Sequence, residues 1–332
     1  MATLHTRFTR RFGLATPIAL APMAGAAGHA LTAACARAGA LGLLGGGYGD
    51  LAWVTQEYDA ALAALDPEQR SRLGCGFITW RLDEDAAALE AVLRHPHPPC
   101  AIMLSFGDPR PYAARIAAAG AALICQIQRM DQLPPAVEAG AALIVAQGTE
   151  AGGHGMASLE GRATFTLVPE AADWLAVHAP DTLLLAAGGI ADGRGLAAAL
   201  MLGADGAVVG SRLWATAESL APRGAQQAAM RATGDDTARS SVFDILRRHA
   251  WPAPYDFRAL RNQLHRAWEG RLAALAADPR PARAAYDAGV AAGDFERAHV
   301  TVGEAVGLIG DVPTAGAWIE RATAQAVAVM GL

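Results

Sequence analysis

A single histidine stands in an unusual position in the stretch QGTEAGGHGM, residues 147–156. His154 follows two glycines that come soon after the apolar run AALIVAQ, which indicates a flexible loop at the end of a buried strand. An imidazole titrates near neutral pH, so it can take up a proton or, when charged, hold an anion. His154 is therefore the first candidate for acid–base chemistry. Glu150 either orients its ring or is an ordinary solvated carboxylate.

Other histidines are weaker candidates. His29 follows APMAGAAG and is expected at the N-terminus of a helix, although it could also face the site. The surroundings of four more are charged and of helical composition: His178, His249, His265 and His299.

Glycine turns follow two other apolar runs, LLLAAGGI and DGAVVGS. Consecutive glycines let backbone N–H groups close on an anion, and a helix that begins there adds the positive end of its dipole. The alternative is that these glycines serve only tight turns and close packing. As an anion site, the two turns would supply four donors: Gly188, Gly189, Gly210 and Ser211. A third loop, GGGYGD, lacks the spacing of a dinucleotide-binding loop.

Apolar runs of strand length recur along the chain, and they begin at residues 17, 41, 73, 100, 121, 141, 182 and 205. They do not alternate polar with apolar residues, which is typical of parallel strands buried on both faces. Alanine-rich segments of helical composition, such as DPRPYAARIAAAG, lie between them. We therefore predict an α/β fold, a (β/α)₈ TIM barrel with its active site at the carboxyl ends of the strands. A doubly wound sheet is the alternative.

The composition changes near residue 216, where the chain becomes more charged and aromatic. We expect residues 1–216 to form the barrel, residues 217–300 a helical insert, and residues 301–332 a helix that returns to the barrel. An insert between the last strand and the last helix would cover the mouth of the barrel. It is therefore predicted to be a lid over the substrate.

Composition argues against several classes of function. The 332 residues carry a formal net charge of −5 without a basic stripe, so no nucleic-acid partner is expected. All 27 basic residues are arginine, which excludes chemistry that requires a lysine amine. The 4 cysteines stand alone and no histidine cluster supplies enough ligands, so we expect no metal and buried thiols in a reducing compartment. No apolar run approaches the roughly 18 residues of a membrane span, and we expect a cytoplasmic protein.

Four motifs together resemble the nitronate monooxygenase family: PIALAPMAG, QGTEAGGHG, AAGGIADGRGLAAALMLGADGAVVGSRLWAT and GEAVGLI. The resemblance covers about residues 8–216 and the final helix. It implies a noncovalently bound FMN, and it implies that His154 faces the flavin. The flavin contacts implied on the first, sixth, seventh and eighth strands are Pro22, Met23, Ala24, Gly25, Gln147, Gly152, Gly153, Gly188, Gly189, Gly210 and Ser211.

The sequence departs from the family at three positions. Gly76 stands where many members have asparagine, Gln126 where a lysine often ends the fifth strand, and Leu20 where a glutamine often precedes the PM motif. These changes remove amide and charged contacts from the polar edge of the flavin, although we still expect Gly76 and Gln126 to contact it. Four residues are expected to line the substrate pocket: Tyr48, Thr79, Ser105 and Glu150.

The resemblance implies oxidation of alkyl nitronates, with nitroalkanes as a further substrate class, by dioxygen to a carbonyl compound and nitrite. His154 would act as acid–base group or anion stabiliser. An alternative on the same barrel is an FMN-dependent NAD(P)H reductase of quinones or enoyl thioesters. A third hypothesis is that the protein is not an enzyme but a barrel that binds a phosphate ligand without turnover. The expected partners are a small molecule and dioxygen, and self-association is left open.

Overall fold

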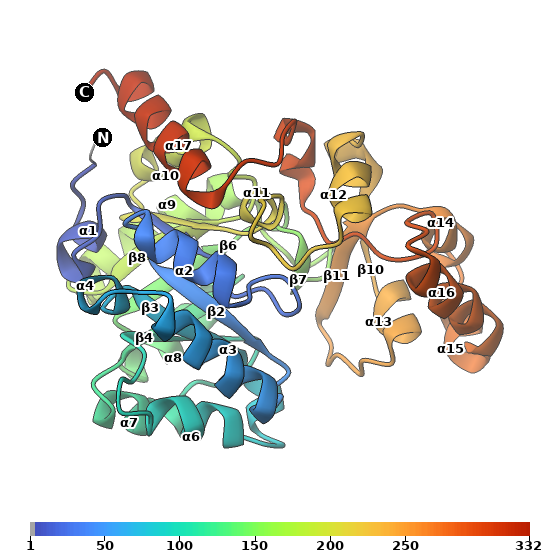
Figure 1. Cartoon of the computed structure of the whole chain (residues 1–332), viewed down its shortest axis with the longest axis horizontal. Coiled ribbons are helices and arrows are strands. Elements are labelled where there is room, and N and C mark those ends of the chain that lie inside the picture. The colour runs from blue at the N-terminus through green and yellow to red at the C-terminus, as the bar shows by residue number, and fades with distance from the viewer. Residues whose placement is uncertain (1–3) are drawn as a thin grey trace.

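The computed structural model of the chain describes residues 4–332. Its centre is a parallel sheet of eight strands in the order β1-β9-β8-β6-β5-β4-β3-β2 (Figure 1). A parallel bridge between Ala19 and Leu41 joins the two end strands and closes the sheet into a barrel. The eight predicted strands are confirmed as β1 Ile18–Leu20, β2 Gly42–Gly47, β3 Leu73–Ile78, β4 Ala101–Ser105, β5 Ala122–Ile127, β6 Leu143–Gln147, β8 Leu183–Ala187 and β9 Gly206–Val209.

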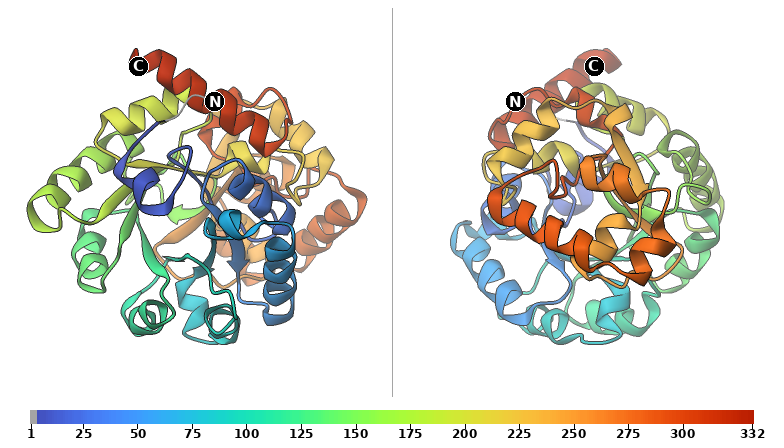
Figure 2. Two further views of the ribbon diagram at one scale, coloured as in Figure 1. Left: turned by 60° about the vertical axis from the view of Figure 1, so that its left-hand side comes forward. Right: turned by 90° about the vertical axis from the view of Figure 1, so that its right-hand side faces the viewer.

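Helices surround these strands (Figure 2). They are α1 Arg7–Phe12, α2 His29–Arg37, α3 Leu51–Ala63, α4 Pro67–Arg70, α5 Thr79–Leu82, α6 Ala87–Leu93, α7 Arg110–Ala118, η1 Met130–Gln132, α8 Leu133–Glu138, α9 Thr164–His178, α10 Gly193–Met201 and α11 Ser211–Trp214. The final helix, α17 Ala315–Met330, lies beside α10 (Figure 1). A Cβ atom on Gly193 would lie 2.4 Å from the carbonyl oxygen of Ala322, so α10 and α17 pack backbone to backbone.

The strands are buried on both faces, which explains why their sequences do not alternate. Leu43, Met103 and Val145 fill the inside of the barrel. Their strand neighbours, such as Leu44 and Ile144, pack outward against the helices. All four cysteines are free thiols, as expected. Burial raises the pKa of one of them, Cys125, to about 12, so that thiol is unreactive at neutral pH.

The segment between β9 and α17 is not purely helical, so the prediction of a helical insert is incomplete. It contains α12 Arg223–Met230, η2 Gly234–Asp236, β10 Thr237–Ser240, α13 Val242–Arg247, β11 Tyr255–Leu260, α14 Gln263–Trp268, α15 Leu272–Ala277, α16 Arg280–Ala292 and η3 Glu304–Leu308. The elements from β10 to α16 lie across one end of the barrel (Figure 2, right). The alternating residues of YDFRAL mark β11 as a strand, but the alanines, leucines and arginines that follow it give the region a helical composition.

The stretch around His154 is also a strand rather than the expected loop. Residues Gly153–Met156 form β7, which pairs antiparallel with β11, and β11 pairs antiparallel with β10. In this register His154 lies opposite Phe257. Glycine is unfavourable in strands, so β7 is held by pairing with the insert rather than by its own propensity.

Among residues 4–332, no helix is long and apolar enough to cross a bilayer. The same residues contain no group of three or more His, Cys, Asp or Glu side chains placed to hold a metal ion.

Candidate active site

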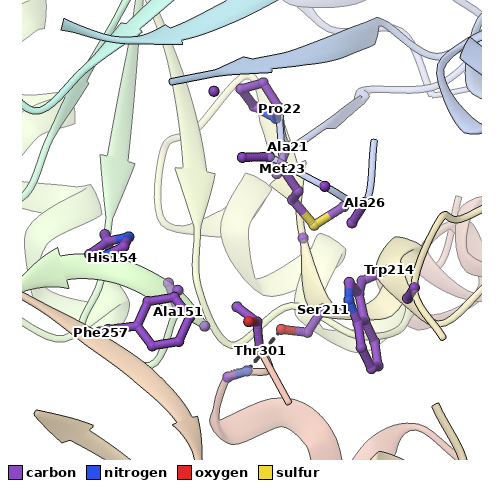
Figure 3. A pocket seen from close by; sticks show the side chains of 18 of the residues that line it. Ala21, Pro22, Met23, Ala26, Ala151, His154, Ser211, Trp214, Phe257 and Thr301 are labelled. Carbon is purple, nitrogen blue, oxygen red and sulfur yellow. Dashed lines mark hydrogen bonds between the residues drawn. The ribbon is translucent and has the colours of Figure 1, made fainter. Parts of the chain in front are cut away.

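A cavity of about 400 Å³ opens at the carboxyl ends of the barrel strands, beneath the insert (Figure 3). All the residues expected to contact a flavin lie on its wall: Pro22, Met23, Ala24, Gly25, Gly76, Gln126, Gln147, Gly152, Gly153, Gly188, Gly189, Gly210 and Ser211. Three of the predicted pocket residues also line it: Tyr48, Ser105 and Glu150. The prediction for Thr79 is wrong, because its side chain is fully buried and packs against Gly107 outside the cavity.

One end of the cavity presents free backbone N–H groups. Gly188 and Gly189 have φ angles of 100° and 75°, a conformation that favours glycine. Within the described part of the chain, the N–H groups of Gly188, Gly189 and Ser211 have no protein acceptor. The Ser211 hydroxyl accepts a 2.8 Å hydrogen bond from the Gly303 N–H (Figure 3). This end therefore offers several donors to one anionic group.

The helix after the seventh barrel strand does not add its N-terminus to this site, contrary to the expectation. The side chain of Asp192 caps α10 and accepts hydrogen bonds from the N–H groups of Arg194 and Gly195, at 2.9 and 3.3 Å. A carboxylate already occupies the positive end of this helix. The glycine turns alone supply the free donors on this strand.

The turn after β1 forms the part of the cavity wall between β9 and β3 and reaches from Gly210 to Gly76. A Cβ atom on Gly76 would lie 2.3 Å from Cγ of Pro22, so any larger residue would collide with this turn. Glycine at position 76 thus fits the close approach of Pro22 in this chain. Leu20 is fully buried among the apolar side chains outside the barrel and does not reach the cavity.

Three glutamines form a hydrogen-bonded chain at the ends of β5 and β6. The side-chain amides of Gln126 and Gln128 both donate to Oε1 of Gln147, each at 3.1 Å. Gln147 in turn donates to the backbone carbonyl of His154 at 3.3 Å. Gln126 is therefore a neutral residue where a lysine would bring a charge. Its hydrogen bond holds the side chain of Gln147, which in turn holds β7.

His154 pairs with an acidic residue of the insert. Its Nε2 lies 2.8 Å from Oδ1 of Asp244, and the two side chains are only 9% and 4% exposed. Burial lowers the pKa of His154 far below its usual 6.5, with Arg247 and Arg239 adding to the effect. Burial raises the pKa of Asp244 to about 7. Burial therefore favours the neutral imidazole in this pair, which supports the acid–base role of His154 over that of a charged anion stabiliser.

The other ring nitrogen of His154 is available to a ligand. Among residues 4–332, Nδ1 has no hydrogen-bond partner, yet it is not one of the fully buried unpaired atoms. Glu150 does not orient this ring, which corrects that reading. Its carboxylate instead accepts hydrogen bonds from the Thr164 N–H at 2.9 and 3.0 Å and from the Thr164 hydroxyl at 3.0 Å.

Aromatic side chains cover His154. The ring of Trp251 stacks on the imidazole at 3.4 Å between centroids with 12° between the planes. Trp251 also donates to the Tyr48 hydroxyl at 2.9 Å and meets Phe106 edge to face at 5.0 Å. Phe106 has φ 66°, a strained conformation for a bulky residue, and such strain is concentrated at functional sites.

A model of the family described as nitronate monooxygenase matches residues 81–325 of this chain. The chain belongs to the nitronate monooxygenase family. It is 33% identical over 340 residues to nitronate monooxygenase npaC of Metarhizium robertsii. The aligned region covers 93% of this chain and 90% of that protein. It is 29% identical to a nitronate monooxygenase of Paraburkholderia phytofirmans over 95% and 94% of the two chains. The family consists of oxidoreductases that use a flavin, so this chain is an enzyme of that class.

Solved structures agree with this membership. FabK from Thermotoga maritima matches with a TM-score of 0.82 and 26% identity, over 99% of this chain and 98% of that one. A nitroalkane oxidase from Streptomyces ansochromogenes matches with a TM-score of 0.79 and 26% identity, over 98% and 99% of the chains. Both span the barrel and the insert, so the whole architecture is shared.

The loop that precedes His154 in this family member is held by two arginines. Arg239, whose side chain is fully buried, donates to the carbonyls of Ala151 and Thr149 at 2.9 and 3.2 Å. Arg258 donates to the same Thr149 carbonyl at 3.0 Å. Because the C=O and N–H of one peptide point in opposite directions, the Ala151 carbonyl on Arg239 turns the Gly152 N–H away from that arginine. Gly152 lies on the cavity wall, and its N–H has no acceptor among the described residues.

Sequence reasoning missed the side chains that the insert brings to the nitronate monooxygenase site. They are Asp244, Arg247, Trp251, Phe257 and His299. The expectation of helical surroundings is wrong for His249 and His299, which lie outside the helices, and His249 stacks on Tyr48. The dense run of aromatic and charged residues from Phe243 to Phe257 was the available signal. His29, by contrast, begins α2 as expected, with Nδ1 2.8 Å from Glu57.

Proposed function

We propose that this enzyme uses FMN to oxidise alkyl nitronates with dioxygen, forming a carbonyl compound and nitrite. The observation that carries this proposal is the buried His154–Asp244 pair on the wall of a cavity whose other end presents free backbone donors. A positioned imidazole suits the removal of a proton from the carbon beside a nitro group. The family membership supports the same reaction.

The residues present fit FMN. The free N–H groups of Gly188, Gly189 and Ser211 would hold the phosphate, since such groups bind anions at barrel loops seven and eight. The turn from Pro22 and the Gln147 amide would contact the ring. When bound, FMN supplies the redox chemistry that passes electrons from the nitronate to dioxygen. We propose the segment 217–300 as the lid that covers it.

The chain's own residues control the proton and the water. With Asp244 ionised, the His154 Nε2–H donates to Oδ1, and Nδ1 carries the free lone pair. A proton taken from a nitroalkane at Nδ1 makes an imidazolium that Asp244 stabilises, which is the role of an orienting carboxylate. Trp251 and Phe106 cover the imidazole, so bulk water is excluded from the base.

Purification gives the first test. The proposal expects a yellow protein that releases FMN on denaturation and consumes dioxygen with ethylnitronate while nitrite accumulates. A colourless protein with no affinity for added FMN would reject it. Anaerobic mixing with NADH or NADPH should leave the flavin oxidised on the timescale of turnover.

His154→Ala tests the acid–base role. We expect the variant to retain FMN and to lose turnover of nitroethane by about 100-fold or more, as for a positioned proton acceptor. His178→Ala is a matched control, since that side chain is stacked on Trp174 at the exposed end of α9. Near-normal turnover in His154→Ala would contradict the assignment.

A second candidate is the NAD(P)H-dependent reduction of quinones or enoyl thioesters on the same barrel. The structural similarity to FabK from Thermotoga maritima favours it, with a TM-score of 0.82. Rapid bleaching of the flavin by NADH or NADPH, followed by reoxidation with a quinone or enoyl thioester, would support this candidate over the first.

A further inference from the structure

Arg247, the last residue of α13, brings a positive charge to the wall of the cavity that carries His154. Its guanidinium carbon lies 5.0 Å from the centroid of the Phe257 ring. The Phe257 ring is 4.7 Å from the imidazole of His154, and all three residues line the cavity. Arg247 therefore belongs to the region where a substrate would meet His154.

Among residues 4–332, no carboxylate lies within ion-pairing distance of this charge, although Asp244, which pairs with His154, interacts with it electrostatically. Within residues 4–332, Nη1 of Arg247 is buried without a hydrogen-bond partner, and no carboxylate is recorded in an ion pair with it. Two neighbouring arginines with buried side chains differ, since Arg239 pairs with Asp256 at 3.1 Å and Arg258 with Glu304 at 2.8 Å. Leaving a buried guanidinium N–H unpaired is costly, so Nη1 of Arg247 indicates a missing anionic acceptor.

No other side chain around the cavity can take this role. Among the described lining residues Arg247 is the only arginine, and the sequence contains no lysine. Burial lowers the pKa of His249 to about 4 and of His299 to about 3, and in both cases Arg247 lowers it further. With His154 also neutral, the guanidinium is the cation that an anionic substrate would meet.

We propose that Arg247 binds the two oxygens of the nitronate group, so that the enzyme selects the anionic nitronate over the neutral nitroalkane. This inference rests on the proposed function and names the residue that recognises its substrate. The planar guanidinium presents parallel N–H donors that match two oxygens on one atom, as in arginine–carboxylate pairs. A neutral nitro group attracts the same donors much less, because it carries no net charge.

The test compares Arg247→Gln and Arg247→Lys with Arg248→Gln, all saturated with FMN. Arg248 is a matched control because it is the next residue, is 55% exposed and pairs with Asp287 at 2.7 Å. We expect R247Q to raise KM for ethylnitronate by about 10- to 100-fold, the factor for one charge-assisted hydrogen bond. KM for nitroethane should change by less than about threefold, R247K should lie between, and R248Q should match the wild type.

Nitrate, a planar anion that cannot be turned over, separates this inference from the proposed function. Its binding is followed by the change in flavin absorbance, and R247Q should weaken it by the same factor as for ethylnitronate. Arg247-dependent nitrate binding supports the anion site even where nitronate turnover is absent, which would reject only the reaction. Equal nitrate and ethylnitronate affinities in wild type and R247Q would overturn the inference. Loss of FMN from a folded R247K would also overturn it, because Arg247 would then serve the cofactor.

Discussion

Replacing Asp244 by asparagine should make the folded protein less stable in mild acid. The reason is that the folded and unfolded states of the variant would no longer bind the same number of protons at His154 and residue 244. In the unfolded chain Asp244 titrates near 3.8 and His154 near 6.5. In the folded protein Asp244 keeps its proton up to about pH 7, whereas burial lowers the pKa of His154 and keeps it neutral. Between about pH 4 and pH 6.5 each state therefore holds the same number of protons, and the wild-type pair adds no slope to stability.

In Asp244→Asn only the histidine remains. Its folded pKa lies below its unfolded value, so below pH 6.5 the unfolded chain binds one proton more than the folded protein. Well below pH 6.5, stability then rises with pH by about 1.4 kcal/mol per unit, and it falls by about 2 kcal/mol from pH 6.5 to 4.5. His154→Gln leaves Asp244 alone, with a folded pKa above its unfolded one. That variant should lose stability at the same slope as pH rises from about 4 to 7.

The assay is urea unfolding of the FMN-saturated proteins at several pH values, with tryptophan fluorescence and circular dichroism as separate probes. The variant-minus-wild-type free energy is the measured quantity, which cancels the other titrating groups. The double variant should run parallel to the wild type. Parallel curves for wild type and Asp244→Asn between pH 4.5 and 6.5 would refute the neutral buried pair.

Three further changes have defined outcomes. Asp244→Asn should slow nitroethane oxidation by about 10- to 100-fold, because one charge-assisted hydrogen bond is lost. The rate of ethylnitronate oxidation should stay within about threefold of the wild type. Equal effects on both substrates would argue for a general structural role. Gly189→Val should weaken FMN binding at least about tenfold in fluorescence titrations, because φ 75° is strained for a branched residue. Gly120→Ala is the control, since Gly120 has a similar φ of 76° but lies on the surface. It should lower the free energy of unfolding without changing FMN affinity. Arg239→Met should lower the free energy of unfolding by about 3–5 kcal/mol by leaving Asp256 unpaired, and a smaller loss in denaturant titrations would mean that water replaces the arginine.

The barrel was predictable because its strands depend on local composition. Runs such as AALIVAQ are apolar at every position, and only a strand buried on both faces requires this. The phosphate-type donors were predictable for a similar reason, since Gly188 and Gly189 adopt positive φ angles that glycine adopts most easily. In both cases one segment of sequence carries the whole signal.

The acid–base pair was not predictable in this way. His154 and Asp244 are 90 residues apart, and they meet only because β7 pairs with β11 of the insert. Nothing local to Asp244 distinguishes it from a solvated carboxylate on an amphipathic helix. Glu150 was the candidate partner because it is near in sequence, but Thr164 takes both of its oxygens. The pairing of β7 with β11 determines which carboxylate contacts His154, and closeness in sequence does not predict that contact.

The two parts of the site also respond differently to substitution. The barrel offers backbone N–H groups, which stay in place as long as the turn keeps its shape. The insert offers side chains, namely Asp244, which pairs with His154, and Arg247, which brings a positive charge. A single substitution in the insert can therefore change which substrate is accepted without disturbing the cofactor site. Because burial favours a neutral His154, Arg247 is the cation that meets the bound substrate, and the choice between nitronate and neutral nitroalkane should follow residue 247.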